Sequence, residues 1–135
     1  MRYSVIDLIQ GKIFKRVVVD NQNDEIRFYK DDDKYVAMYH RQDCCECVTI
    51  DDINGDVSDL ENTPILVAEE RWETGEDGEW GESFTWTFYT LRTAKGSVDI
   101  KWYGSSNGYY SESVYVEEVK GPSNMPWDIT YRPLK

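Results

Sequence analysis

The most reactive side chains of this sequence are concentrated between His40 and Cys47, a segment that holds the only histidine and all three cysteines. Cys44 and Cys47 form a C-x-x-C pair, and His40 lies four residues before Cys44. Zinc takes thiolate and imidazole ligands in tetrahedral geometry, so this spacing raises the question of a zinc site. A structural zinc site usually needs a second ligand pair, which this sequence lacks. We therefore predict no metal and no cofactor.

Covalent chemistry at the same segment is an alternative. A redox C-x-x-C needs a stabilised thiolate, and the acidic surroundings disfavour one. A Cys/His nucleophile would use His40 with Cys44 or Cys45, with Asp43 orienting the imidazole. The sequence shows neither an oxyanion hole nor a nucleophile elbow, so we assign no catalytic residue and keep an enzyme as an open alternative. We expect one thiol to fill the core, another to lie at the surface, and no disulfide.

A second chemically rich stretch follows Trp102, where tyrosine, serine, asparagine and glycine predominate. Such side chains recognise rings and polar edges at low entropic cost, and Lys101 offers a point charge to phosphate. A hairpin turn whose aromatic side chains close the core is the alternative reading. Our hypothesis is that the two stretches converge into one pocket. Its predicted ligand-binding residues are His40, Asp43, Cys44, Cys45, Glu46, Lys101, Tyr103, Ser105, Ser106, Asn107, Tyr109 and Tyr110.

Strands must position these residues, because β-branched and aromatic runs with period-two alternation dominate the sequence. Residues 84–91 read FTWTFYTL, and with residues 97–103 and 113–119 they predict an antiparallel three-stranded meander. Further strands are expected at 13–19, 26–29, 35–40 and 64–70, with a turn at 30–34. Helix is limited to one or two turns, near residues 4–10 and 58–62. The predicted fold class is mainly β or α+β, a single domain built on an antiparallel sheet.

Length, composition and net charge exclude several classes of protein. The 135 residues suit a single domain with a real core, and 14% are aromatic, too many for a disordered chain. The net charge is −11, which disfavours direct DNA binding or an anionic membrane. No signal peptide or apolar membrane span is visible, so we expect a cytoplasmic protein.

The excess negative charge lies entirely in residues 51–82, where twelve acidic residues accompany a single basic one. A solvated face is the simpler interpretation, and residues 73–81 are expected to form an exposed loop. A surface that meets a basic partner is the functional alternative. Its predicted partner-facing residues are Asp51, Asp52, Asp56, Asp59, Glu76, Asp77 and Glu79. Residues 52–58 resemble the start of a calcium loop but fail later in the pattern, so an Asx-type turn is expected. The proline-containing tail, residues 121–135, is expected to be extended.

Several of these strings together resemble a family of small phage and prophage proteins of unknown function. They read HxQDCCE from His40, IxDIxGDxxDL from Ile50, then PI and AEE, and later TWTFY, KG and WYGxSNGYYSE from Trp102. The resemblance extends over about residues 36–118. It implies a phage accessory protein, acting in the infected or lysogenic bacterial host, and such proteins often blunt host defence. In that family the position of Cys47 is usually not cysteine, which weakens the metal and redox interpretations.

Three functions follow, in order of preference. The first is non-enzymatic sequestration of a small, nucleotide-like signal. The second is an acidic protein that blocks a basic, nucleic-acid-binding cleft of a host protein. The third is a Cys/His-dependent enzyme. A homo-oligomer is compatible with each of the three.

Overall fold

The computed structural model describes residues 5–31, 33–40, 45–77, 82–107 and 111–120. The order of elements is α1 (Val5–Leu8), β1 (Arg16–Val19), β2 (Glu25–Tyr29), β3 (Lys34–Tyr39), β4 (Cys47–Asn54), the 3-10 turn η1 (Val57–Leu60), β5 (Val67–Asp77), β6 (Glu82–Arg92), β7 (Ser97–Ser106) and β8 (Tyr115–Lys120). The predicted antiparallel, mainly β class is confirmed. In the described part of the chain, no helix has the length and hydropathy of a membrane span.

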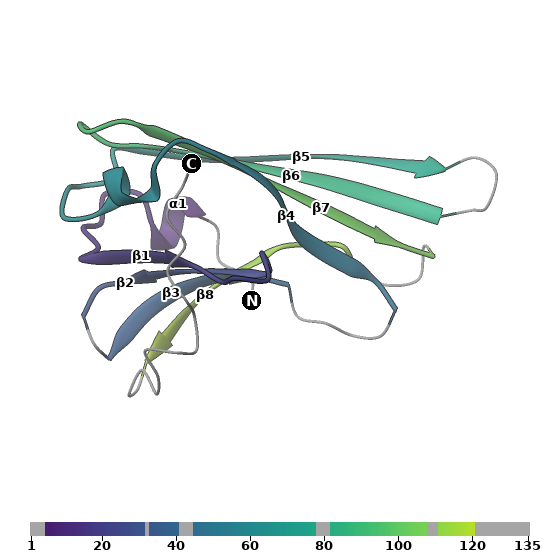
Figure 1. The fold of residues 1–135 in the computed structure, drawn as a ribbon, viewed down its shortest axis with the longest axis horizontal. Helices are drawn as coiled ribbons and strands as arrows, with labels where there is room; N and C mark the ends of the chain where they lie inside the picture. Colours follow the sequence, from purple (N-terminus) through teal and green to yellow (C-terminus); the bar gives the residue numbers. More distant parts are fainter. Residues whose placement is uncertain (1–4, 32, 41–44, 78–81, 108–110, 121–135) are drawn as a thin grey trace.

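The strands form two four-stranded antiparallel sheets that pack face to face (Figure 1). One sheet has the order β1-β2-β3-β8, and the other has the order β4-β7-β6-β5. Sheets with one apolar face bury it against each other, and here the shared core includes Phe14, Phe28, Tyr89 and Trp102, all fully buried. Figure 1 shows β5, β6 and β7 extending at one end well beyond the smaller sheet.

The alternation in β6 and β7 determines which side chains face the core. On β7 the buried residues are Val98, Ile100 and Trp102, whereas Lys101 and Tyr103 are only half-buried on the other face. The β6–β7 register pairs Thr87 with Trp102, so one face of FTWTFYTL points inward and the other outward. The inward residues are Thr85, Thr87, Tyr89 and Leu91, and the outward residues are Phe84, Trp86, Phe88 and Thr90. The predicted strand and turn are confirmed here, and the Thr93 N–H donates to the Gly96 carbonyl at 2.8 Å.

Three expectations about the strands are wrong. The predicted third meander strand is β8, and it pairs with β3 in the opposite sheet because its apolar residues complete that face of the core. The loop expected from residue 73 is instead β5 as far as Asp77, whose eleven residues pair continuously with β6. The loop expected from residue 104 begins later, because β7 continues to Ser106.

Short local motifs join the two sheets and connect their strands. The Ile50 N–H of β4 donates to the Asn23 carbonyl in the β1–β2 turn at 2.7 Å. The predicted Asx-type turn is confirmed, since the Asp56 carboxylate accepts from the Ser58 N–H at 2.9 Å. Asp56 caps η1, so this turn begins at Val57, one residue before the turn expected near residues 58–62. The β4 strand, residues 47–54, was not predicted, because its second half is acidic and exposed.

Candidate functional site

The inner face of the larger sheet changes from apolar to polar along its length. On β7 the inward-facing residues toward the end of the strand are Trp102, Gly104 and Ser106. On the neighbouring β6 the inward-facing residues at the same end of the sheet are Thr87, Thr85 and Ser83. Hydroxyl groups therefore replace hydrocarbon where the larger sheet extends past the smaller one (Figure 1). A polar inner face at an open end is a position where a ligand can reach buried groups.

Glu112 lies across this polar face because Gly104 has no side chain. A Cβ on Gly104 would lie 3.0 Å from the Cβ and carbonyl oxygen of Glu112 and 3.0 Å from Val48 Cγ2. The glycine thus allows the backbone of residues 111–114 to approach β7 closely. As a result, Glu112 is only 8% exposed although it carries a carboxylate.

Three hydroxyl groups hold the Glu112 carboxylate. Thr85 Oγ1 donates to Oε1 at 2.8 Å, Ser106 Oγ donates to Oε2 at 2.5 Å, and Ser83 Oγ also donates to Oε2. The described residues provide no ion-pair partner for this carboxylate. Burying a carboxylate is costly unless it is hydrogen-bonded, and here hydroxyl donors alone compensate for that cost.

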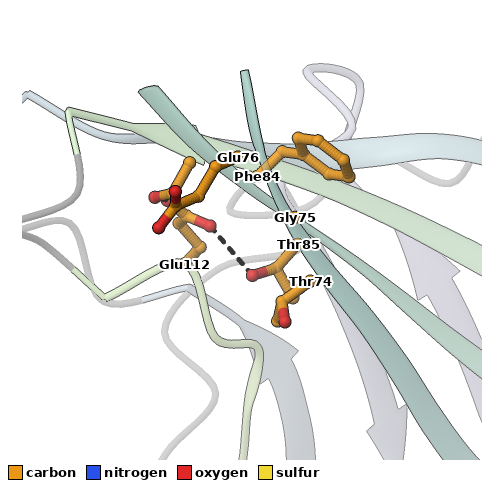
Figure 2. A pocket seen from close by; sticks show the side chains of 7 residues that line it. Thr74, Gly75, Glu76, Phe84, Thr85 and Glu112 are labelled. Carbon is orange, nitrogen blue, oxygen red and sulfur yellow. Dashed lines mark hydrogen bonds between the residues drawn. The ribbon is translucent and has the colours of Figure 1, made fainter. Parts of the chain in front are cut away.

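A pocket of about 330 Å³ opens directly onto this carboxylate. We call it the Glu112 pocket, and its lining residues are Thr74, Gly75, Glu76, Ser83, Phe84, Thr85 and Glu112. Figure 2 shows Glu76 from β5 and Glu112 from the opposite wall extending into the same space, with Thr85 bonded to Glu112. Its volume lies at the lower end of the range of small-molecule sites, roughly 300–1,000 Å³.

A second buried polar pair lies on the other side of residues 111–114. The His40 side chain is 2% exposed and that of Glu46 is 0% exposed, and His40 Nε2 lies 2.8 Å from Glu46 Oε2. His40 Nδ1 donates to the Ser113 carbonyl at 2.7 Å. Because Nδ1 carries a proton, a single further proton lies between Nε2 and the carboxylate. This pair fixes Ser113, and so helps to fix the adjacent Glu112.

The His40 pocket, of about 350 Å³, adjoins this pair; its lining residues are Asp24, Glu25, Tyr39, His40, Glu46, Cys47, Val48 and Thr49. At its rim, the hydrogen bond that the Asp24 carboxyl group makes to Asp20, and then partial burial, raise the pKa of Asp24 to about 6. Carboxylates therefore line this pocket as well as the Glu112 pocket.

The structure brings together only some of the residues predicted to form one ligand pocket. His40 and Glu46 lie together, and residues 47 and 105 are paired between β4 and β7, so the two predicted stretches do converge. Lys101 and Tyr103, however, lie on the outer face of the larger sheet. Lys101 Nζ lies 4.4 Å from the centroid of the Trp86 ring, and the Tyr103 ring also lies 4.4 Å from it. The predicted phosphate and ring contacts therefore face away from the Glu112 pocket.

Other predicted ligand residues are distributed as follows. Ser106 bonds Glu112, Ser105 lies on β7 with its side chain half-buried, and Asn107 is exposed just after the strand. Asp43, Cys44, Tyr109 and Tyr110 lie outside the described residues.

The described cysteines differ from each other. Cys45 is disulfide-bonded, which contradicts the expectation of thiols alone, and Cys47 is a free, exposed thiol. Both ring nitrogens of His40 are engaged, by Ser113 and Glu46, so in this conformation His40 is oriented by Glu46 rather than by a cysteine partner.

The acidic segment does not form one continuous face. Asp51 and Asp52 are exposed on β4, Asp56 and Asp59 lie at η1, and Glu76 lies near the end of β5. The Asp51 carboxylate lies 3.8 Å from Lys101 Nζ. Glu76 lines the Glu112 pocket, Asp77 ends β5, and Glu79 lies outside the described residues.

Sequence reasoning missed Ser83, Thr85 and Glu112 as site residues. Ser83 and Thr85 belong to a predicted strand, where hydroxyl side chains are ordinary. The single available signal was that Ser83, Thr85 and Thr87 share one face of an alternating strand, opposite to Phe84, Trp86 and Phe88. That pattern shows that one face of the strand carries hydroxyl groups, but it does not show whether this face is covered by the second sheet.

Comparison with known proteins gives a family and no activity. No curated protein and no solved structure matches this chain. The family model described as "Domain of unknown function (DUF7448)" matches residues 8–116, which include strands β1 to β7 and the Glu112 pocket. On that match, the chain belongs to the DUF7448 family of domains of unknown function.

Proposed function

We propose that this protein is a non-enzymatic binding protein that takes up a small polar ligand in the Glu112 pocket. The observation that carries the proposal is a buried carboxylate held by three hydroxyls at the base of an open pocket. The biological setting we propose is the one implied by the sequence resemblance: a phage accessory protein that counters host defence by sequestering a nucleotide-like signal.

A nucleotide-like ligand would enter this pocket by its base or ribose rather than by its phosphate. Carboxylate and hydroxyl oxygens accept hydrogen bonds, so they suit the N–H edge of a base or the hydroxyls of a sugar. The seven lining residues that the structure describes include no lysine, arginine or histidine. Phosphate groups would therefore remain at the mouth, in solvent.

Binding without catalysis is favoured because the reactive groups are already engaged. His40 uses both nitrogens in buried hydrogen bonds, and Glu112 accepts from three hydroxyls. A general base must reach the proton it removes, and neither group is free to do so in this arrangement. An enzyme would lose its effect in a folded His40→Ala or Cys44→Ser variant, whereas a binding protein that does not use this thiol for chemistry would keep its effect in Cys44→Ser.

The test is thermal unfolding in the presence of a panel of nucleosides, nucleotides and other polar metabolites. A ligand at 100 times its Kd stabilises the native state by about 2.7 kcal/mol, which should raise Tm by on the order of 10 °C for a domain of this size. The rise should disappear in Ser83→Ala and persist in Thr90→Ala, whose hydroxyl bonds Asp99 on the outer face. A panel in which no compound raises Tm, together with native mass spectrometry showing no bound molecule from infected cells, would contradict the proposal.

A second candidate, the acidic inhibitor of a basic host protein, is favoured by the exposure of Asp51, Asp52 and Asp56 on neighbouring parts of β4 and η1. Such a protein should co-purify with a host protein and release it as salt is raised, because exposed charges are screened. Charge reversal at Asp52 should weaken this association, whereas Ser83→Ala should not.

A further inference from the structure

We infer that the ligand group that enters the Glu112 pocket is an organic nitrogen cation, an ammonium or guanidinium group. The inference rests on the proposed function because both place a ligand in this pocket, but it assigns a cationic group, in place of a neutral base edge or ribose, to the position beside Glu112. It follows from the direction of the hydrogen bonds, the charge of the lining and the size of the space.

The direction of the hydrogen bonds is set by Glu112. A hydroxyl group has one hydrogen and two lone pairs. Ser83 and Thr85 each direct that hydrogen to the Glu112 carboxylate. What these two side chains can still offer to a ligand is therefore acceptor capacity, and an acceptor surface selects groups that carry N–H or O–H donors.

The charge of the lining selects among donors. Glu76 and Glu112 are the titratable residues of the lining, and both are carboxylic acids. Among the described lining residues there is no cation, and Glu112 has no ion-pair partner in that part of the chain. A ligand ammonium or guanidinium would make charge-assisted hydrogen bonds here, which are stronger than those of a neutral alcohol. A phosphate or carboxylate would be repelled.

The shape of the pocket limits the ligand to a small one. The Phe84 ring packs over Gly75, so closely that a side chain on Gly75 would overlap it. That ring lies on the outer face of the sheet, where it stacks on Tyr103, and it points away from Glu112 (Figure 2). A short ligand would reach Ser83, Thr85 and Glu112 with its charged end while the rest of it stays at the open mouth. The volume of about 330 Å³ suits a group of this size.

The experiment compares three probes of the same length by isothermal titration calorimetry: 1,4-diaminobutane, 1,4-butanediol and butanedioate. We expect the diamine to bind and the dicarboxylate not to bind. Hydrogen bonds to charged groups are worth enough to make the diamine about 10- to 100-fold tighter than the diol. Nα-acetyl-lysine methylamide serves as a fourth probe. Tighter binding of this compound than of the diamine indicates a lysine side chain of a partner as the source of the cation, and weaker binding indicates a free amine.

Variants locate the binding. Glu112→Gln keeps the shape and removes the charge, so it should abolish the preference for diamine over diol. Glu76→Gln acts at the exposed rim, cannot disturb the core, and should weaken diamine binding a few-fold. Glu69→Gln is the matched control: it removes the same charge from the same strand, but its register partner Thr90 places it on the outer face. It should leave the diamine Kd unchanged.

Two results would overturn the inference. One is equal affinity for diamine and diol, or tighter binding of butanedioate. The other is an equal loss of diamine affinity in Glu76→Gln and Glu69→Gln, which would mean that the amine binds the acidic surface without a specific site. If a nucleoside binds, Ser83→Ala prevents its binding and the amine does not bind, the proposed function stands and this inference alone fails.

Discussion

Replacement of His40 by alanine tests how the polar end of the interior is held together. The His40 and Glu46 side chains are 2% and 0% exposed, and the imidazole makes hydrogen bonds of 2.8 Å to Glu46 and 2.7 Å to the Ser113 carbonyl. His40→Ala leaves a buried carboxylate and a buried carbonyl without this partner. Breaking a buried pair in this way costs about 3–5 kcal/mol, a large part of the roughly 5–15 kcal/mol that stabilises a domain.

The assay is urea unfolding, in which the midpoint should fall while the slope stays constant. An ion pair of nearly the same length provides the control: Lys30 Nζ lies 2.7 Å from Glu118 Oε2, but the two side chains are 29% and 26% exposed. Lys30→Ala should cost at most about 1 kcal/mol, because exposed pairs contribute little. The double variant His40→Leu/Glu46→Leu should recover part of the loss, since it removes the stranded carboxylate along with its partner.

The reasoning would be refuted by a loss below about 1 kcal/mol in His40→Ala, which is the range of exposed pairs. It would equally be refuted if His40→Leu/Glu46→Leu were much less stable than His40→Ala, as expected when the loss of Glu46 costs as much stability as the loss of His40. Either result would mean that the Glu46 carboxylate finds other partners or water when the imidazole is removed.

Two further predictions concern backbone packing and pH. Gly104→Ala should destabilise the protein by about 1–3 kcal/mol, because the new Cβ meets the Glu112 backbone at 3.0 Å. Gly75→Ala should cost less, because its Cβ meets the end of the Phe84 side chain, which can move. Equal losses of the two variants in urea unfolding would contradict this prediction. The pKa of Asp24 is raised from 3.8 to about 6, so its contribution to stability is present below pH 4 and is lost as pH rises through 6. Asp24→Asn should remove that pH dependence. In the unchanged protein, the free energy of unfolding should differ by roughly 1 kcal/mol between pH 4 and pH 7 on account of Asp24, after solvent screening. If unfolding curves of Asp24→Asn show the same difference between the two pH values, Asp20 and Asp24 do not share a proton.

Local patterns predicted the strands well where one face is clearly apolar. Residues 97–103 alternate strictly, and they form most of β7 with Val98, Ile100 and Trp102 buried. The turn after β6 contains Gly96 between two alternating runs, which is a strong hairpin signal. Both features are determined by residues that are close together in the chain, so local sequence patterns are enough to predict them.

Pairing between distant strands could not be predicted in the same way. β8 follows β7 in the chain but pairs with β3, because its apolar residues fit the face of the smaller sheet. Residues 73–77 are acidic and glycine-containing, yet they extend β5 because β6 supplies a continuous partner. Both outcomes depend on tertiary contacts that override local propensity.

The site illustrates the same limit. Alternation in FTWTFYTL showed that Thr85 and Thr87 lie on the face opposite Trp86, but it did not show which face meets the second sheet. The structure places Thr85 inward and Trp86 outward, which transfers the site from the tyrosine-rich stretch to the hydroxyls around Glu112. Glu112 was part of a recognised string, but its burial follows from the close approach to Gly104, a contact between segments that no spacing rule describes.

The most direct measurement is a methyl NMR titration that follows Thr85, which lines the Glu112 pocket, and Thr90, which bonds Asp99 on the outer face of the same strand. With a compound that raises Tm, we expect the Thr85 methyl resonance to shift in a saturable way while that of Thr90 stays in place. Saturable shifts at Thr90 with none at Thr85 would contradict a ligand site at Glu112.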